Sequence, residues 1–196
     1  MPNSYCTFCI AYFEKVQFLD LGKQPITNNF LIKKNPKNEF FYNLKLIFHK
    51  SSKLVSLAKF IPPKKMFNEK YAHRASASKT MSLAYSKLAK SIKNRFKPKS
   101  ILEIGSNDGV FIKHFKKIKN LGVEPCKNLA KITNQAGVKT YDEFWTKKIA
   151  KKIVSQNGKV DVIYSANTIS HIHNLNETFK AIDYTLHENG VFILED

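Results

Sequence analysis

Arginine is nearly absent from a sequence that is otherwise strongly basic. The 196 residues include 33 lysines and arginines against 15 acidic residues, a formal net charge of +18, yet only Arg74 and Arg95 are arginines. Base readout and two-pronged phosphate binding favour arginine, and the lysines are spread along the chain. A nucleic-acid partner is therefore not expected. A lysine-rich solvated surface, with some attraction for an anionic ligand, explains the charge better.

Long apolar runs and a cysteine framework are also missing. No stretch approaches the roughly 18 apolar residues of a membrane-spanning helix, and the first nine residues have neither a basic segment nor an apolar run. We therefore expect no signal peptide, no membrane partner and a cytoplasmic location. Three cysteines do not make a disulfide scaffold. Cys6 and Cys9 form a C-x-x-C pair, which indicates metal or redox chemistry, and Cys126 stands alone.

Apolar residues make up 43% of the chain, enough for a buried core. Residues 1–60 are rich in aromatics and turns, with strand-like alternation in 44–48. Ile61-Pro62-Pro63 breaks this pattern, and residues 64–96 have apolar residues at helical spacing. The sequence thus predicts a first domain over 1–60, a helical linker over 61–97 and a larger domain over 98–196.

Strand and helix patterns alternate throughout 98–196, which is typical of an α/β fold with a doubly wound parallel sheet. The sequence shows no internal repeat. The expected strands are 101–104, 121–124, 160–165 and 191–195, and the expected helices are one that follows residue 109 and ends near 119, one over 127–136 and one over 175–186.

The most specific local pattern is a glycine-containing loop after the first of these strands. Gly105 and Gly109 stand four positions apart, Glu103 precedes them, and Glu124 closes the next strand 19 positions after Gly105. An acidic residue at about that distance accepts hydrogen bonds from ribose hydroxyls in nucleotide-binding sheets. The dinucleotide pattern G-x-G-x-x-G is absent, whereas E-x-G-x-x-x-G resembles the first motif of class I S-adenosylmethionine methyltransferases. A plain strand-to-helix turn is the alternative interpretation.

Further motifs follow one another in order along the whole chain. They are Cys6-x-x-Cys9, Phe18-Leu19-Asp20-Leu21-Gly22, Asn28-Asn29-Phe30-Leu31, Met66-Phe67, Tyr71-Ala72-His73-Arg74-Ala75-Ser76-Ala77-Ser78, the glycine loop, Gly122-Val123-Glu124-Pro125, Glu143-Phe144 and Ser165-Ala166-Asn167-Thr168-Ile169-Ser170-His171-Ile172. Together they resemble the sugar C-methyltransferases, enzymes that methylate carbon 3 of nucleotide-linked 4-keto-deoxysugars. The resemblance implies a class I methyltransferase Rossmann-like parallel sheet, here truncated, preceded by a small zinc-binding-like domain and a helical linker.

The chain departs from this family at the zinc site. The family uses two C-x-x-C pairs, and here His49 and Ser52 stand where the second pair is expected. Histidine binds zinc well, whereas a serine hydroxyl is a poor ligand. Two interpretations remain open: zinc held by Cys6, Cys9 and His49, or a domain that has lost its metal and is held by its apolar core.

The second departure is the end of the chain. The family continues for about as many residues again, including a segment that supplies the proposed catalytic base. The strand 191–195 would be left as a bare edge. We therefore expect a truncated reading frame or half of a split enzyme, with a separate chain as the partner that supplies the missing half.

The resemblance also implies roles for individual residues. His171 corresponds to an active-site histidine and Tyr71 to a pocket tyrosine, although a structural histidine and a core aromatic are the alternatives. We expect an enzyme that takes S-adenosylmethionine and a nucleotide-sugar, and the competing hypothesis is a basic binding or assembly module that keeps the fold without catalysis. The residues expected to hold the methyl donor are Glu103, Gly105, Asn107, Gly109, Glu124, Phe144 and Asn167.

Overall fold

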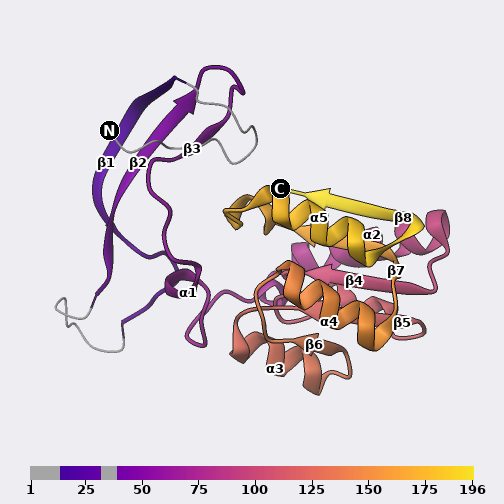
Figure 1. The fold of residues 1–196 in the computed structure, drawn as a ribbon. Helices are drawn as coiled ribbons and strands as arrows, with labels where there is room; N and C mark the ends of the chain where they lie inside the picture. The colour runs from indigo at the N-terminus through magenta and orange to yellow at the C-terminus, as the bar shows by residue number, and fades with distance from the viewer. Residues whose placement is uncertain (1–13, 32–38) are drawn as a thin grey trace. The chain divides into compact units, whose positions relative to one another are not determined.

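The structure is a computed structural model, and it describes residues 14–31 and 39–196. Cys6 and Cys9 therefore lie outside the described residues. The chain divides into two compact units, Met1–Phe67 and Asn68–Asp196. Figure 1 shows the strands and helices of both units, coloured from indigo at the N-terminus to yellow at the C-terminus.

The first unit contains a three-stranded antiparallel sheet. Strand β2 lies between β1 and β3, and its alternation of apolar residues was the pattern recognised over 44–48. The turn that joins β2 to β3 is closed by Lys53, whose φ of 58° is left-handed and whose N–H donates to the carbonyl of His49. The elements are β1 (Lys15–Pro25), β2 (Phe41–His49), β3 (Val55–Leu57) and a short helix α1 (Pro63–Met66).

The helix expected over 64–96 is interrupted, and its main part, α2 (Lys79–Phe96), starts at residue 79. Ser78 caps it by accepting a hydrogen bond from the N–H of Met81 at 3.2 Å. Between α1 and this cap, only a 3-10 turn forms, η2 (Ala75–Ala77), where the N–H groups of Ala75 and Ser76 bond to side chains of the glycine loop. The helix ends at Lys97, which is left-handed with φ 45°, just before Pro98.

The second unit is built on a parallel sheet with the strand order β6-β5-β4-β7-β8, which confirms the α/β class. Its central strand β4 is buried along its whole length. The chain turns from β4 to β5 on one side and later to β7 on the other, so the strand order reverses at β4. In open α/β sheets, ligands bind at the carboxyl ends of the strands beside such a reversal. The strands are β4 (Ser100–Ile104), β5 (Lys119–Val123), β6 (Lys139–Tyr141), β7 (Val160–Ala166) and β8 (Leu186–Glu195).

Separate apolar clusters cover the two faces of this sheet. Alternate residues of β4 point to opposite faces, with Leu102 and Ile104 in one cluster and Ile101 in the other. The first cluster includes side chains of α4 (Lys147–Asn157) and α5 (Leu175–Thr185), and the second includes side chains of α2. Because Glu103 alternates with Leu102 and Ile104, it lies on the α2 face of the sheet.

The helix expected directly after the glycine loop does not form. Only a 3-10 turn, η3 (Ile112–Phe115), occupies that segment. Val110, Phe111 and Ile112 are buried in succession, and within the turn itself Ile112 and Phe115 are buried.

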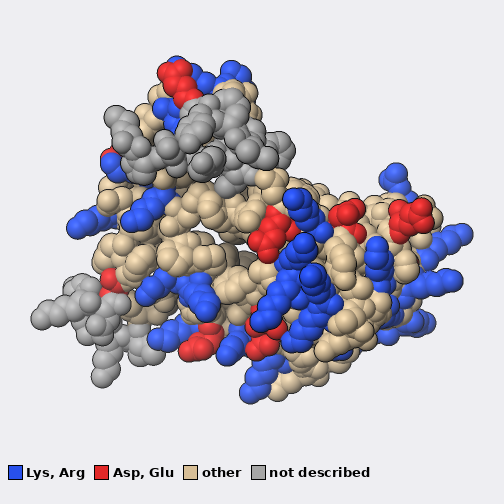
Figure 2. Space-filling view, viewed as in Figure 1, with Lys and Arg blue, Asp and Glu red and all other residues tan. Residues whose placement is uncertain are grey.

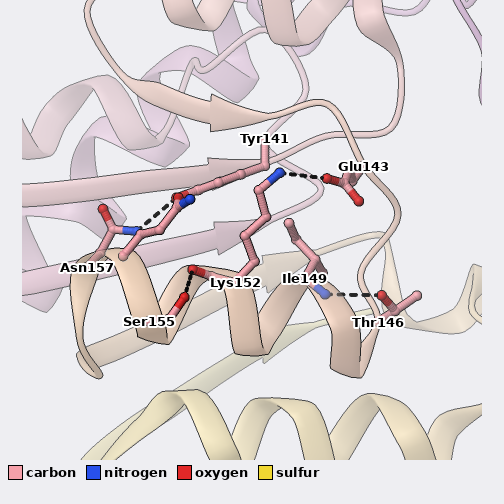
Figure 3. A network of polar contacts seen from close by, with 8 residues as sticks. Tyr141, Glu143, Thr146, Ile149, Lys152, Ser155 and Asn157 are labelled. Carbon is pink, nitrogen blue, oxygen red and sulfur yellow. Dashed lines mark hydrogen bonds and ion pairs between the residues drawn. The ribbon is translucent and has the colours of Figure 1, made fainter.

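The sequence patterns also failed to indicate β6 and α4. The strand has only three residues, and the helix follows it after a short loop. The hydroxyl of Tyr141 donates to Gln156 at 2.9 Å and accepts from the amide of Asn157 at 2.8 Å, which joins the strand to the end of the helix (Figure 3). Lys152 pairs with Glu143 at 3.0 Å beside the same ring.

Lysine side chains dominate the charged surface that Figure 2 draws, with few acidic side chains between them. This follows from the composition of the chain. In the parts of the chain that the structure describes, none of the helices is both long enough and apolar enough to cross a bilayer.

Candidate functional site

The glycine loop, residues 105–109, makes a tight turn at the carboxyl end of β4. Gly105, Asn107 and Gly109 all have left-handed φ angles, of 75°, 48° and 77°. The N–H groups of Gly105 and Ser106 both donate to the carbonyl of Val123, at 2.8 and 3.2 Å. The turn is thereby fastened to the end of β5.

Both glycines are also required by close packing. A Cβ atom at Gly105 would lie 2.1 Å from the hydroxyl oxygen of Thr168, and one at Gly109 would lie 2.8 Å from the methyl carbon of Thr133. The hydroxyl of Thr133 in turn donates to the carbonyl of Asn107 at 3.1 Å. Any side chain at either glycine would therefore displace a neighbouring element.

Glu124 is a buried carboxylate that connects the loop to the next helix, α3 (Lys127–Gln135). Its Oε2 accepts from the N–H of Asn107 at 2.8 Å, and its Oε1 accepts from the N–H of Cys126 at 2.9 Å. Burial raises the pKa of Glu124, and these N–H groups partly oppose that rise. The expected contact with ribose hydroxyls stays a prediction, and each oxygen retains a second acceptor position for it.

Glu103, the acidic residue of β4, is also buried, and one of its carboxyl oxygens lacks a hydrogen-bond partner among the described residues. Only 5% of its surface is exposed, and its Oε2 has no hydrogen-bond partner among the described residues. Burial raises the pKa of Glu103 well above its ordinary value, and the nearby Glu124 and Asp108 carboxylates raise it further against the N–H of Ile112. This carboxyl group therefore favours its neutral form.

Residues 71–78, which we call the strap, cross the glycine loop and are held there by loop side chains. The amide of Asn107 accepts from the N–H of Ala75 at 2.9 Å and donates to the carbonyl of His73 at 3.3 Å. Asp108 accepts from both the N–H and the hydroxyl of Ser76. The side chain of Asn107 thus bonds to the strap, and its backbone N–H bonds to the carboxylate of Glu124. The motif did not indicate these two separate roles.

Tyr71 reaches the site through the same strap. Asn128, in the first turn of α3, donates to the carbonyl of Tyr71 at 2.9 Å, and the Tyr71 ring packs edge-on against His73 with ring centres 6.4 Å apart. The tyrosine is half-buried. The structure therefore places it beside the start of α3.

The remaining predicted residues follow the carboxyl ends of neighbouring strands. Asn167 comes directly after β7, is exposed and left-handed with φ 49°, and donates its N–H to Glu195 at 2.7 Å. His171 ends the 3-10 turn η4 (Ile169–His171) and is exposed. Phe144 lies half-buried in the loop between β6 and α4. All of them therefore follow the carboxyl ends of strands of the sheet.

Buried polar atoms without partners gather at this edge. Among the described residues, three of the four such side-chain atoms belong to Glu103, Ser106 and Asn128. Leaving a buried polar group unsatisfied costs about 1–3 kcal/mol, so these atoms are candidates for contact with a bound molecule. Sequence reasoning missed Ser106, although it stands inside the motif, and nothing in the sequence signalled Asn128.

The fourth unpartnered atom is Nδ1 of His49 in the first unit. The ring is buried, and its Nε2 lies 2.9 Å from the hydroxyl of Ser56. Burial lowers the pKa of His49, with a further contribution from Lys15. The neutral imidazole is the form that binds metals, so His49 fits a zinc ligand. The described residues contain no cluster of three or more potential ligands, and Cys6 and Cys9 lie outside them.

Two family models together match nearly the whole chain. Residues 71–196 match the model of a methyltransferase domain. Residues 6–67 match a model described as "Putative zinc binding domain".

Individual proteins are similar to all or part of this chain. The C-methyltransferase NovU of Streptomyces niveus is 24% identical over 99% of this chain, and the chain spans only 47% of that protein. Among solved structures, the PH0226 protein of Pyrococcus horikoshii OT3 matches 62% of this chain and 60% of its own at 17% identity, with a TM-score of 0.51. A SAM-dependent methyltransferase of Archaeoglobus fulgidus matches 57% and 51% at 16% identity, with a TM-score of 0.48.

The side chain of Asn107 is predicted to hold the strap. Asn107→Gly keeps the left-handed backbone but removes two hydrogen bonds to the strap, each worth about 1 kcal/mol. Hydrogen exchange at the Ala75 amide should accelerate roughly 10- to 30-fold as a result. Asn28→Gly is the matched control, because Asn28 is also left-handed, with φ 64°, and lies in the first unit. Equal exchange at Ala75 in both variants would show that the strap is held by other contacts.

Proposed function

The chain belongs to the methyltransferase domain family, and we propose that its glycine loop binds S-adenosylmethionine for transfer of a methyl group to carbon 3 of a nucleotide-linked keto-deoxysugar. The observation that carries this proposal is the set of unpartnered buried polar atoms on Glu103, Ser106 and Asn128. Glu103 precedes the loop, Ser106 lies in it and Asn128 lies in the first turn of α3, near the point where the strand order reverses and such sheets bind ligands.

The donor supplies an electrophilic methyl group attached to a positively charged sulfur. In the proposed arrangement, the backbone of Gly105 and Gly109 lets a ligand approach closely, and Glu103 faces its positive charge. Glu124 accepts hydrogen bonds from ribose hydroxyls with its remaining lone pairs. Phe144 packs on the adenine, and Asn167 lies where the ligand would cross the end of β7.

The proposed acceptor is an anionic nucleotide-sugar. Support comes from the likeness to a C-methyltransferase over 99% of this chain and from the net charge of +18, which attracts anions. The acidic proton beside a keto group must be removed before carbon can act as a nucleophile. His171 is assigned to polarising the keto oxygen or moving that proton, and Tyr71 to lining the pocket.

The zinc assignment is a separate proposal. It rests on the match of residues 6–67 to the zinc-binding family model and on the buried, unpartnered Nδ1 of His49. Cys6, Cys9 and His49 would hold the metal, and its role would be to fold the first unit. Because Ser52 replaces a thiolate, occupancy should be weak.

A further chain segment is also proposed to complete the enzyme. The chain spans 47% of its curated relative, and β8 pairs only with β7 among the described strands. Ile193 and Leu194 of β8 are left partly or largely exposed. A strand added at that edge would satisfy the backbone groups of β8 and cover these side chains. The alternative, a basic module that keeps the fold without catalysis, predicts no need for such a segment.

Donor binding tests the proposed function directly. Gly105→Ala should raise the dissociation constant for S-adenosylmethionine at least tenfold, about 1.4 kcal/mol, because the new Cβ would lie 2.1 Å from Thr168. Gly137→Ala is the matched control, with φ 84° but nothing within 4 Å of the added Cβ. Titration calorimetry on both variants, with thermal unfolding to confirm that each is folded, makes the comparison. Donor affinity that is the same in both variants would place the site elsewhere.

Zinc content tests the assignment in the first unit. We expect substoichiometric zinc after mild dialysis of the unmodified chain, and near-complete loss in Cys6→Ser and His49→Gln. His187→Gln, an exposed histidine of the second unit, should keep the zinc of the unmodified chain. Elemental analysis measures all four proteins, and stoichiometric zinc that persists in Cys6→Ser would refute the ligand set.

Activity tests the need for a further segment. A positioned base contributes roughly 10²–10⁴-fold, so this chain alone should methylate a nucleotide-linked 4-keto-deoxysugar slower by that factor than the chain mixed with a separately expressed completing segment. Transfer from labelled S-adenosylmethionine measures both rates. Full activity from the chain alone would mean that residues 1–196 already hold the catalytic base.

A further inference from the structure

The carboxylates beside the glycine loop form no ion pair with the described residues, although the chain carries 33 lysines and arginines. Glu103 lies in β4, one residue before its end, Asp108 lies in the loop and Glu124 follows β5. The charges that act on Glu103 come from Glu124 and Asp108, which are both acidic. No ion pair of the described residues involves any of the three.

The other groups facing Glu103 are also acidic or phenolic. Tyr85 of α2 has its pKa raised to about 12, by burial first and then by Glu103, Glu195 and Asp108. On β7, burial raises the pKa of Tyr164, and Tyr85, Glu195 and Glu103 raise it further. Its hydroxyl lies 3.2 Å from the carboxylate of Glu195 on β8. Glu124 and Asp108 therefore oppose a negative charge on Glu103, and the neutral phenols of Tyr85 and Tyr164 supply no positive charge to offset it.

The burial and hydrogen bonding of Glu103 also favour a protonated carboxyl group. The Glu103 carboxyl group is buried to 5% exposure and has one oxygen without any partner, and the N–H of Ile112 is the backbone donor that reaches it. A buried carboxylate is stable only when it is paired or fully hydrogen-bonded. Without a ligand, the group therefore keeps its proton.

We propose that Glu103 determines the selectivity of the site for a cationic ligand, by holding a proton in the ligand-free protein and releasing it to solvent when a positively charged donor binds. This inference rests on the proposed function. The carboxylate left behind provides the negative charge that the ammonium and sulfonium groups of S-adenosylmethionine require. The unpartnered Oε2 is the atom that the ligand would satisfy.

Release of the Glu103 proton on ligand binding should make donor affinity depend on pH. A cation lowers the pKa of Glu103 in the complex, so between the pKa of the complex and that of the free protein each binding event releases close to one proton. Donor affinity then rises about tenfold per pH unit as the pH increases through that window. A neutral nucleoside such as 5′-methylthioadenosine gains nothing from an ionised carboxylate, and its affinity should not follow pH in this way.

Titration calorimetry of the full chain in two buffers of different ionisation enthalpy counts the protons released. For S-adenosylmethionine we expect between about 0.5 and 1 proton per site in the window where affinity depends on pH, and for 5′-methylthioadenosine close to none. Binding of S-adenosylmethionine with no proton release at any pH between 5 and 9 would overturn the inference and leave the proposed function intact. Absence of donor binding would instead overturn the proposed function, and the inference with it.

Variants assign the proton to its residue. Glu103→Gln should bind S-adenosylmethionine without proton release and with an affinity that no longer changes with pH. Glu188→Gln is the control, because Glu188 is an exposed carboxylate of the same unit, and it should release as many protons as the unmodified chain. Unchanged proton release in Glu103→Gln would assign the exchange to another group and refute the proposal. Should Glu103→Gln fail to fold, the comparison of charged and neutral ligands on the unmodified chain decides the question alone.

Discussion

The carboxylate of Glu124 holds two parts of the site together, and the rest of the edge depends on that link. It binds the backbone of Asn107 in the glycine loop and the backbone of Cys126 at the start of α3. With the loop fixed, the side-chain amide of Asn107 accepts a hydrogen bond from the strap, and the hydroxyl of Thr133 in α3 donates to the carbonyl of Asn107. Because one oxygen serves each partner, loss of the carboxylate would release the loop and the helix together.

The site combines this well-satisfied carboxylate with a poorly satisfied one. Glu124 is buried but receives a backbone N–H at each oxygen, whereas Glu103 is buried with one oxygen unpartnered. The two carboxyl groups thus differ, because both oxygens of Glu124 bind backbone N–H groups and one oxygen of Glu103 has no partner among the described residues. Unsatisfied buried groups lower stability, so their concentration at one edge of an otherwise well-packed sheet is typical of a binding site and not of a structural core.

The same contrast appears in the first unit on a smaller scale. His49 has one ring nitrogen engaged near the hydroxyl of Ser56 and the other buried without a partner. Of the four unpartnered buried side-chain atoms of the described residues, one thus belongs to the proposed zinc ligand, and the other three belong to Glu103, Ser106 and Asn128. The lysine-rich surface needs no such explanation, because exposed ammonium groups are hydrated wherever they lie.

The sequence by itself determined the parallel α/β sheet, the position of the glycine loop and the acidic residue that follows β5, because these depend on local pattern: apolar strands, glycines that permit left-handed angles and a fixed spacing between strand ends. It did not determine β6, α4 or the missing helix after the loop, because three-residue strands carry little periodicity and the buried run from Val110 to Ile112 satisfies packing on several sides at once. The partners of Asn107, Asp108 and Asn128 were decided only by tertiary structure. Their contacts with the strap join residues more than 30 positions apart. A local sequence pattern does not indicate which distant backbone groups will lie near a side chain once the sheet is packed.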